Sequence, residues 1–200
     1  MYSNATVSAT DSSVRLAAAG NITLGSVSAD DVSVFTSGGA IINSSAAITN
    51  VTAENLRLAA DDAIGVSNLH LNLNVDVLSA SSSGTNSAGI YLTESNGVTV
   101  DAVAVTVTEL ESDSTTGMVT DSSQSDLSTG NNGFIILVVT TGNIVLNDGG
   151  DSDGRVVSVA GSGGILVDAL AGSLSIHADI LSATGHVTLK AGTHLSLGAG

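Results

Sequence analysis

Proline is absent from this sequence, although average usage of about 5% would place on the order of ten prolines in a chain of 200 residues. Proline has no backbone N–H and is excluded from strands that are hydrogen-bonded on both sides, so its absence is typical of a chain that lies in a sheet almost throughout. The 23 glycines and the abundant serine, threonine, asparagine and aspartate supply turn residues. The composition therefore predicts strands that are separated by tight corners.

Cysteine is also absent, which excludes disulfides and thiolate metal sites. Tryptophan is missing as well, and the chain has only 2 Phe, 2 Tyr and 2 Met. The core must therefore be built from valine, isoleucine, leucine and alanine, which are small and similar in size.

Basic residues are few, because 4 Lys and Arg stand against 19 Asp and Glu and give a formal net charge of −15. Nucleic-acid binding depends on Lys and Arg that displace counterions from phosphates, so this charge argues against a nucleic-acid partner. The longest purely apolar run is FIILVV at residues 134–139, which is too short to cross a membrane as a helix. We therefore expect neither nucleic-acid binding nor membrane insertion.

One pattern occurs twice, first as VSADDVSVFTSGGAI (27–41) and then as VTAENLRLAADDAI (51–64). In both segments two acidic or amide residues precede an alternating apolar pair, and a short polar stretch ends in Ala-Ile. We predict that the segments lie over one another in successive coils, with these pairs in register: Val27 with Val51, Val32 with Leu56, Val34 with Leu58, and Ile41 with Ile64.

The repeat extends beyond these two segments. Anchor residues at Val7, Val27, Val51 and Val77 are separated by 20, 24 and 26 residues. A period of this length that drifts through loop insertions is the signature of a solenoid. Within each unit apolar and polar residues alternate, as in LHLNLNVDV at 69–77, which indicates strands with one buried face.

Residues 111–132 interrupt the pattern with ESDSTTGMVTDSSQSDLSTGNN, which offers little to bury. We interpret this segment as a loop or insertion that leaves the solenoid. The alternation also changes phase near Ala102, which predicts a bulge or corner. The run at 134–139 is apolar on both faces, so we predict a strand that the insertion covers.

The stretch NDGGDSDG at 147–154 has the highest density of oxygen ligands in the chain. Asn147, Asp148, Asp151 and Asp153 lie among glycines that permit sharp turns, and calcium prefers six to eight oxygen ligands on such a backbone. These four residues form a candidate calcium site. The stretch lacks the glutamate at position twelve of an EF-hand, so a plain acidic turn is the alternative interpretation.

Short motifs recur in which glycine precedes an alternating triplet: GNITL (20–24), GVTV (97–100) and GNIVL (142–146). Together with A-x-x-x-V-x-L spacers and the acidic composition without proline or cysteine, they resemble the repeat regions of filamentous-haemagglutinin-like and other giant bacterial surface proteins. The resemblance covers most of the chain outside 111–132. It implies a right-handed parallel β-solenoid that is exported to the cell surface or the medium and works in adhesion, cell contact or matrix formation.

We therefore expect residues 1–200 to form a single all-β domain, a parallel β-solenoid of the right-handed β-helix type with rungs of about 20–26 residues. We expect it to be a non-enzymatic structural or adhesive rod segment, excised from a longer repetitive chain and located outside the cell or on its surface. The expected partners are other copies or adjacent repeats stacked end to end, and surface glycans or proteins of a host or neighbouring cell.

Two alternatives remain open. A carbohydrate-active β-helix enzyme, such as a polysaccharide lyase or glycosidase, usually needs aromatic platforms and basic residues, and both are scarce here. The paired carboxylates Asp30–Asp31 and Asp61–Asp62 recur at equivalent places, so we interpret them as solvated corners and assign no catalytic residue. A calcium-stiffened β-sandwich module normally carries turn prolines and a core Trp or Tyr, which are not evident here.

Overall fold

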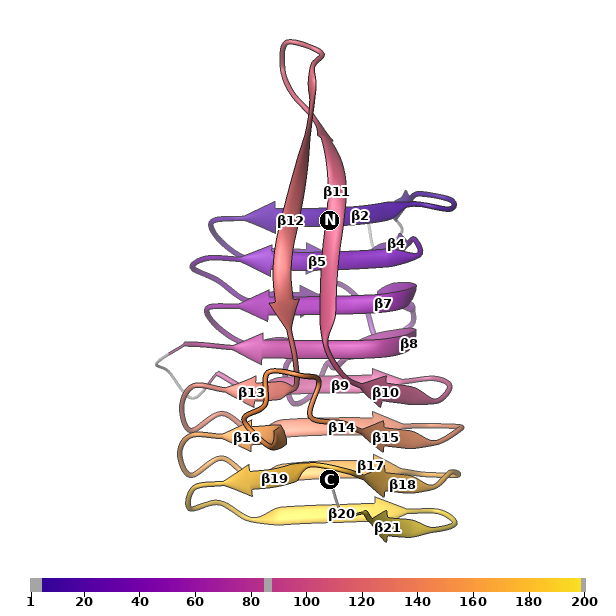
Figure 1. Cartoon of the computed structure of the whole chain (residues 1–200), viewed down its shortest axis with the longest axis vertical. Helices are drawn as coiled ribbons and strands as arrows, with labels where there is room; N and C mark the ends of the chain where they lie inside the picture. Colours follow the sequence, from indigo (N-terminus) through magenta and orange to yellow (C-terminus); the bar gives the residue numbers. More distant parts are fainter. Residues whose placement is uncertain (1–4, 85–87, 199–200) are drawn as a thin grey trace.

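The computed structural model describes residues 5–84 and 88–198, which are all-β and contain no helix (Figure 1). No helix long and apolar enough to cross a membrane occurs among these residues. The strands are β1 (Thr6–Ser8), β2 (Ser13–Ala18), β3 (Ile22–Leu24), β4 (Ser26–Ser28), β5 (Asp31–Thr36), β6 (Ile41–Asn43), β7 (Val51–Ala60), β8 (Leu71–Ser82), β9 (Ile90–Glu94), β10 (Val98–Val100), β11 (Val103–Leu110), β12 (Thr116–Gln124), β13 (Leu127–Thr129), β14 (Ile135–Val139), β15 (Ile144–Leu146), β16 (Arg155–Val159), β17 (Ile165–Ala169), β18 (Leu174–Ile176), β19 (Asp179–Ser182), β20 (Val187–Ala191) and β21 (Leu195–Leu197).

Seventeen of these strands form one large sheet in which neighbouring strands run parallel. Each strand pairs with the equivalent strand one coil earlier or later, so the sheet is solenoid-like and its strands are stacked along the long axis (Figure 1). The number of residues in one coil varies. It is small between the paired residues Val14 and Val32 and larger between the paired residues Ile135 and Ile165. Parallel pairing differs from the antiparallel sheets of a β-sandwich module, so the sandwich alternative does not match this sheet.

The register predicted from the doubled pattern is confirmed. Val27 pairs with Val51, and the alternating pairs of 27–41 and 51–64 lie over one another through β5 and β7. Ile41 pairs with Ile64 through an isolated bridge. Period-two patterning thus fixed both the buried face and the position of each strand along the coil.

The fourth predicted anchor, Val77, is wrong. Leu73 lies over Val51, whereas Val77 pairs with Asn55. The reason is that the alternation of buried and exposed side chains changes phase inside β8. The buried side chains are odd-numbered up to Val75, Val77 is only partly buried, and full burial resumes at Leu78. A strand that bends between two faces of the coil swaps its inward and outward positions, and alternation alone cannot locate that bend.

Apolar side chains of the same kind stack in columns through the interior of the coil. We call a column the set of residues that pair in succession from coil to coil. One column is almost entirely isoleucine and consists of Ile22, Ile41, Ile64, Ile90, Ile135, Ile165 and Val187. Most of these side chains are fully buried, so uniform branched residues fill a core that lacks tryptophan.

One acidic residue breaks an interior column. Glu94 pairs with Leu73 on one side and with Val139 on the other, and it is completely buried. Its Oε2 accepts a hydrogen bond from the backbone N–H of Val75 at 3.1 Å, and its Oε1 accepts from the N–H of Ser95 at 2.7 Å. The carboxylate therefore satisfies backbone donors at a corner of the coil.

The segment that leaves the sheet differs from the predicted loop at 111–132. It is the antiparallel hairpin of β11 and β12, and residues 127–129 have already rejoined the sheet as β13. The phase change near Ala102 is the point where the chain departs. In residues 103–110 apolar and polar side chains alternate, as they do in the stacked strands of the large sheet. Their pattern therefore gives no sign that they pair within a hairpin.

The hairpin lies across β2, β5, β7 and β8 and projects beyond β2 (Figure 1). It therefore does not cover β14 in the manner predicted from the run at 134–139, and Phe134 is 52% exposed. The inward face of β14 is buried and its outward residues are partly exposed, which is the ordinary pattern of a strand with one covered face.

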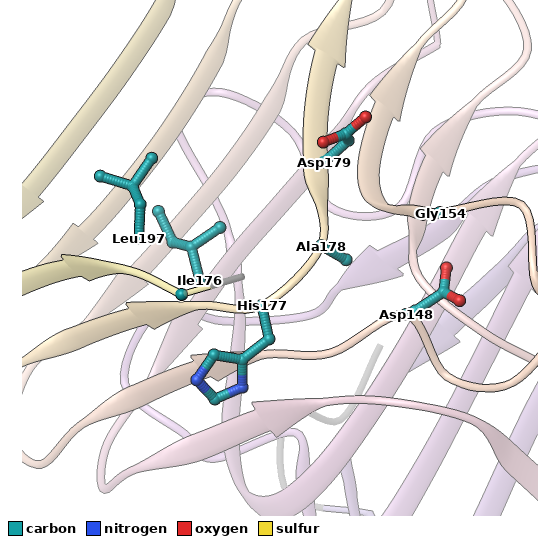
Figure 2. A pocket seen from close by; sticks show the side chains of 8 residues that line it. Asp148, Gly154, Ile176, His177, Ala178, Asp179 and Leu197 are labelled. Carbon is teal, nitrogen blue, oxygen red and sulfur yellow. The ribbon is translucent and has the colours of Figure 1, made fainter. Parts of the chain in front are cut away.

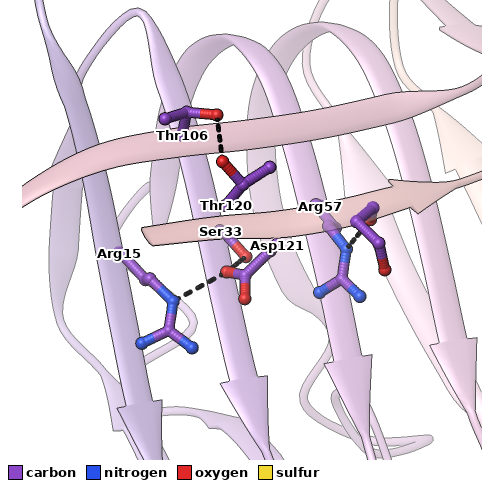
Figure 3. Close-up of polar contacts among 7 residues, drawn as sticks. Arg15, Ser33, Arg57, Thr106, Thr120 and Asp121 are labelled. Carbon is purple, nitrogen blue, oxygen red and sulfur yellow. Dashed lines mark hydrogen bonds and ion pairs between the residues drawn. The ribbon is translucent and has the colours of Figure 1, made fainter. Parts of the chain in front are cut away.

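Polar contacts fasten the hairpin to the strands beneath it (Figure 3). The Nε of Arg15 donates to Oδ2 of Asp121 at 2.9 Å, and the hydroxyl of Ser33 donates to the same oxygen at 2.7 Å. The Nε of Arg57 donates to the carbonyl of Ser122 at 3.1 Å. Burial works against ionisation of Asp121, but the bonds from Arg15 and Ser33, together with the positive charges of Arg15 and Arg57, outweigh it and lower the pKa of this carboxyl.

Candidate metal centre

Two irregular segments leave the stacked strands at the same place on neighbouring coils. The first connects β10 with β13 and contains the hairpin, and the second is the turn between β15 and β16. Because β10 pairs with β15 and β13 pairs with β16, both segments leave and re-enter the sheet side by side. Asp126, at the return from the hairpin, is therefore placed beside the turn at 147–154.

Three aspartates come together at this junction. One carboxylate oxygen from each of Asp126, Asp151 and Asp153 lies within 4.8 Å of the others. Two of them belong to the candidate set predicted from sequence, and the third comes from the base of the hairpin. Three carboxylates on two different segments form an acidic site of the composition that hard divalent cations prefer.

Asp126 is the buried member of this group. Its residue is 6% exposed, and its Oδ1 is buried without a hydrogen-bond partner. Its φ is 71°, a left-handed conformation that aspartate and asparagine adopt more readily than most residues. Burial, followed by the negative charges of Asp151, Asp153, Asp148 and Asp101, raises the pKa of Asp126 to about 7.

Asp151 and Asp153 are exposed and are oriented by bonds within their own turn. The hydroxyl of Ser125 donates to Oδ2 of Asp151 at 2.7 Å, which links the turn to the hairpin base. The N–H of Arg155 donates to Oδ1 of Asp153 at 2.7 Å. The Nη1 of Arg155 lies 3.8 Å from Oδ2 of Asp153, and both side chains are nearly half exposed, so solvent weakens this ion pair.

The other two predicted ligands have different surroundings. Asn147 donates through Nδ2 to Asp101 at 2.8 Å, and its Oδ1 lies 3.0 Å from Nδ1 of His177. This amide therefore takes part in a polar ladder between coils. Asp148 is half-buried, its Oδ1 has no hydrogen-bond partner, and its charge acts on Asp126.

Asp126 could not be found from sequence reasoning. It lies in the segment that is predicted to be a polar loop, and twenty residues separate it from the turn at 147–154. Only the stacking of β13 on β16 brings the two together. The one available signal is a lone aspartate between Ser125 and Leu127, and single aspartates in polar segments are common in this chain.

A pocket of about 320 Å³ lies next to the turn (Figure 2). Asp148 and His177 contribute its polar wall, and Ile176 and Leu197 contribute apolar surface. Leu197 belongs to β21, an edge strand of the sheet, so the pocket sits where the stack of coils ends. The pocket is therefore part of the uncovered edge of the last coil.

The other acidic pair with a predicted role has structural contacts. Asp31 pairs with Asn55, and its Oδ1 accepts a hydrogen bond from Nδ2 of Asn55 at 2.7 Å. The hydroxyl of Ser13, one coil earlier, lies 3.4 Å from Oδ2 of Asp31. Asp31 begins β5 next to a corner, in agreement with the interpretation of Asp30–Asp31 as a corner. It lies over Asn55, however, whereas Asp61–Asp62 follow the other end of β7, so the prediction that the two acidic pairs occupy equivalent places is wrong.

No family model matches this chain, and no curated protein and no solved structure is similar to it by the same standard of comparison. The candidate site and the function that follows are therefore argued from the sequence and the geometry of this chain.

Proposed function

We propose that this chain is a non-enzymatic rod segment of a cell-surface or secreted protein, built as a right-handed parallel β-solenoid. Its role is structural or adhesive, in filament formation, matrix or contact with surface glycans or proteins of another cell. The resemblance to filamentous-haemagglutinin-like repeats and the acidic, aromatic-poor composition support this assignment. The observation that carries it is the continuity of the apolar columns from one edge of the sheet to the other.

Three columns begin and end on apolar residues. The pairs of first and last described members are Val14 with Leu197, Leu16 with Ile180, and Ile22 with Val187. All strands of the large sheet run parallel, so the last strands of one copy match the first strands of the next in direction and side-chain type. A head-to-tail contact of this kind repeats without closing and produces a filament.

The last coil leaves apolar side chains uncovered. Leu197 is 74% exposed and Val187 is 43% exposed, although their columns are buried further along the sheet. Their strands also present unpaired backbone groups, which form a template for another strand. The occupant that we propose is the first coil of a second copy, with Val14 of that copy over Leu197.

Sedimentation velocity and negative-stain imaging over a concentration series test this proposal. We expect stiff end-to-end particles whose length grows with concentration. Leu195→Lys and Val187→Lys place a charge in the contact and should abolish growth, whereas Phe134→Lys, at an exposed position beside β14 and away from both edges, should leave it unchanged. A chain that stays monomeric at every concentration contradicts the proposal.

A glycan hydrolysis screen distinguishes the remaining enzyme alternative. Turnover of a polysaccharide by the purified chain would replace the structural assignment with a carbohydrate-active one. We expect no turnover, because the chain has few aromatic and basic residues to bind an acidic glycan.

A further inference from the structure

Among the described residues, none forms a hydrogen bond or an ion pair with the buried Oδ1 of Asp126. The nearest charged groups named above are other carboxylates. A buried carboxylate without a hydrogen bond or positive partner is costly. Native proteins meet this cost with a paired charge or a bound cation.

We infer that Asp126, Asp151 and Asp153 bind one calcium ion, which fastens the base of the β11–β12 hairpin to the turn between β15 and β16. This site differs from the one predicted from sequence, because the buried ligand comes from the hairpin base and Asn147 is replaced. The inference does not depend on end-to-end association, since all three residues lie within one chain.

The spacing of the oxygens suits calcium. Calcium–oxygen distances of 2.3–2.6 Å place two ligands on opposite sides of the ion about 4.6–5.2 Å apart. The three aspartate oxygens lie within 4.8 Å of one another, so one ion can contact all of them. Magnesium usually keeps several of its waters and binds through only one or two carboxylates, so a group of three protein carboxylates favours calcium.

The chemistry of the group also favours calcium over softer metals. All three ligands are carboxylates, and the chain has no cysteine. The nearby imidazole of His177 is engaged with Asn147. Zinc and copper sites in proteins are dominated by histidine and cysteine, whereas calcium accepts oxygen ligands only. Asp148, whose Oδ1 has no hydrogen-bond partner, is the nearest source of a further oxygen.

Arg155 does not remove the need for a cation. Its guanidinium contacts Asp153 on the exposed side at 3.8 Å and carries one charge. Asp126 lies on the buried side of the group. A divalent ion between the three carboxylates would offset the repulsion that the turn now imposes on the hairpin base.

The test is calorimetric titration of EDTA-treated protein with calcium chloride, with magnesium chloride in parallel, combined with thermal unfolding. We expect one calcium site and a rise in the unfolding midpoint of about 3–6 °C at ten times Kd. Asp126→Asn and the double variant Asp151→Asn/Asp153→Asn should weaken calcium binding at least tenfold. Asp61→Asn/Asp62→Asn removes the same charge as the second variant at a distant corner and should bind calcium as the unchanged chain does.

The stability of the calcium-free variants shows whether weaker calcium binding results from loss of a ligand or from loss of the fold. Asparagine suits the left-handed backbone at residue 126, and the change relieves carboxylate repulsion, so Asp126→Asn should melt in EDTA at or above the unchanged chain. Hydrogen exchange should slow at 125–127 and 148–155 when calcium is added, but not in this variant. Absence of calcium heat and of a midpoint shift at millimolar calcium overturns the inference. An equal response to magnesium, or an equal loss in the Asp61/Asp62 variant, also overturns it.

Discussion

The Nε of Arg15 and the Oδ2 of Asp121 lie 2.9 Å apart although 106 positions separate them in the chain. Arg15 belongs to β2, near one edge of the sheet, and Asp121 belongs to the hairpin that leaves the sheet several coils later. This contact, together with those of Ser33 and Arg57, ties strands of different coils to one crossing element. Most other long-range contacts of the chain join only neighbouring coils.

Replacing Asp121 with alanine should loosen the hairpin. The change leaves Arg15 and the hydroxyl of Ser33 without their shared acceptor, and hydrogen bonds to charged groups of this kind contribute about 1.5–3 kcal/mol. Hydrogen exchange at 103–124 should accelerate, and the urea midpoint should fall. Asp113, in the exposed loop of the same hairpin, accepts hydrogen bonds from Thr115 within its own turn, so Asp113→Ala should move the urea midpoint much less than Asp121→Ala. Equal effects of the two variants would contradict the docking role of Asp121.

Truncating the isoleucine column should be among the most destabilising changes in the chain. Ile64 is completely buried between Ile41 and Ile90, so Ile64→Ala leaves a cavity and should cost about 2–5 kcal/mol in the free energy of unfolding. Leu110→Ala removes a comparable volume from a side chain that is 71% exposed and should cost less than about 0.5 kcal/mol. Urea unfolding monitored by circular dichroism distinguishes the two. Similar midpoints would mean that the column does not form the core.

Two glycines offer a matched pair for close packing of coils. A Cβ at Gly172 would collide with the backbone carbonyl of Gly142 one coil earlier, so Gly172→Ala should shift the backbone and cost about 1–3 kcal/mol. A Cβ at Gly20 meets nothing within 4 Å, and its φ is not positive, so Gly20→Ala should be neutral or stabilising by up to about 1 kcal/mol. Thermal unfolding of both variants gives the comparison. A Gly172→Ala variant as stable as Gly20→Ala would show that the coils can separate freely there.

Glu94 should make stability depend on pH in an unusual direction. Burial raises its pKa above the ordinary value of 4.5, although bonds from the N–H groups of Asn96, Ser95 and Val75 oppose the rise. Above pH 4.5 and up to the raised pKa, the folded chain therefore binds more protons than the unfolded chain. The free energy of unfolding that this carboxyl contributes falls as pH rises through this interval.

Glu94→Gln removes this titration. The difference in unfolding free energy, unchanged chain minus variant, should therefore decrease as pH rises from 4.5 through the raised pKa of Glu94. Urea midpoints at intervals across that range give the measurement, and taking the difference cancels the other carboxyl groups. A difference that increases with pH would mean that the backbone bonds outweigh burial at this residue.

The sequence was sufficient for those parts of the fold that recur locally. Val27 over Val51 and Ile41 over Ile64 followed from alternation and from a repeat of apolar spacing, and both depend on neighbouring coils having nearly the same pattern. The acidic turn at 147–154 was also recognisable, and two of its four predicted ligands, Asp151 and Asp153, lie in the cluster. Features that repeat, or that lie within one turn, need no knowledge of distant contacts.

The parts that failed depend on contacts between distant residues. Val103–Leu110 alternates as a coil strand does, yet it pairs with β12 because the segment that follows turns back on it. The repeat spacing predicted the wrong partner for Val77, because β8 bends within an unbroken alternating run. Asp126 has the local context of a surface loop, and only the parallel stacking of β13 on β16 places it against the acidic turn.

Because the hairpin crosses strands near only one edge of the sheet, the two edges should unfold in different ways. At the edge formed by β19, β20 and β21, a strand detaches by breaking contacts with one neighbour, so thermal fraying can proceed coil by coil. At the opposite edge, β2 cannot peel away without also releasing Arg15 from Asp121, while Ser33 holds β5 and Arg57 holds β7 to the same hairpin. Mechanical load along the long axis would thus open the molecule from the β21 side first, and the strands under the hairpin would yield together as one unit.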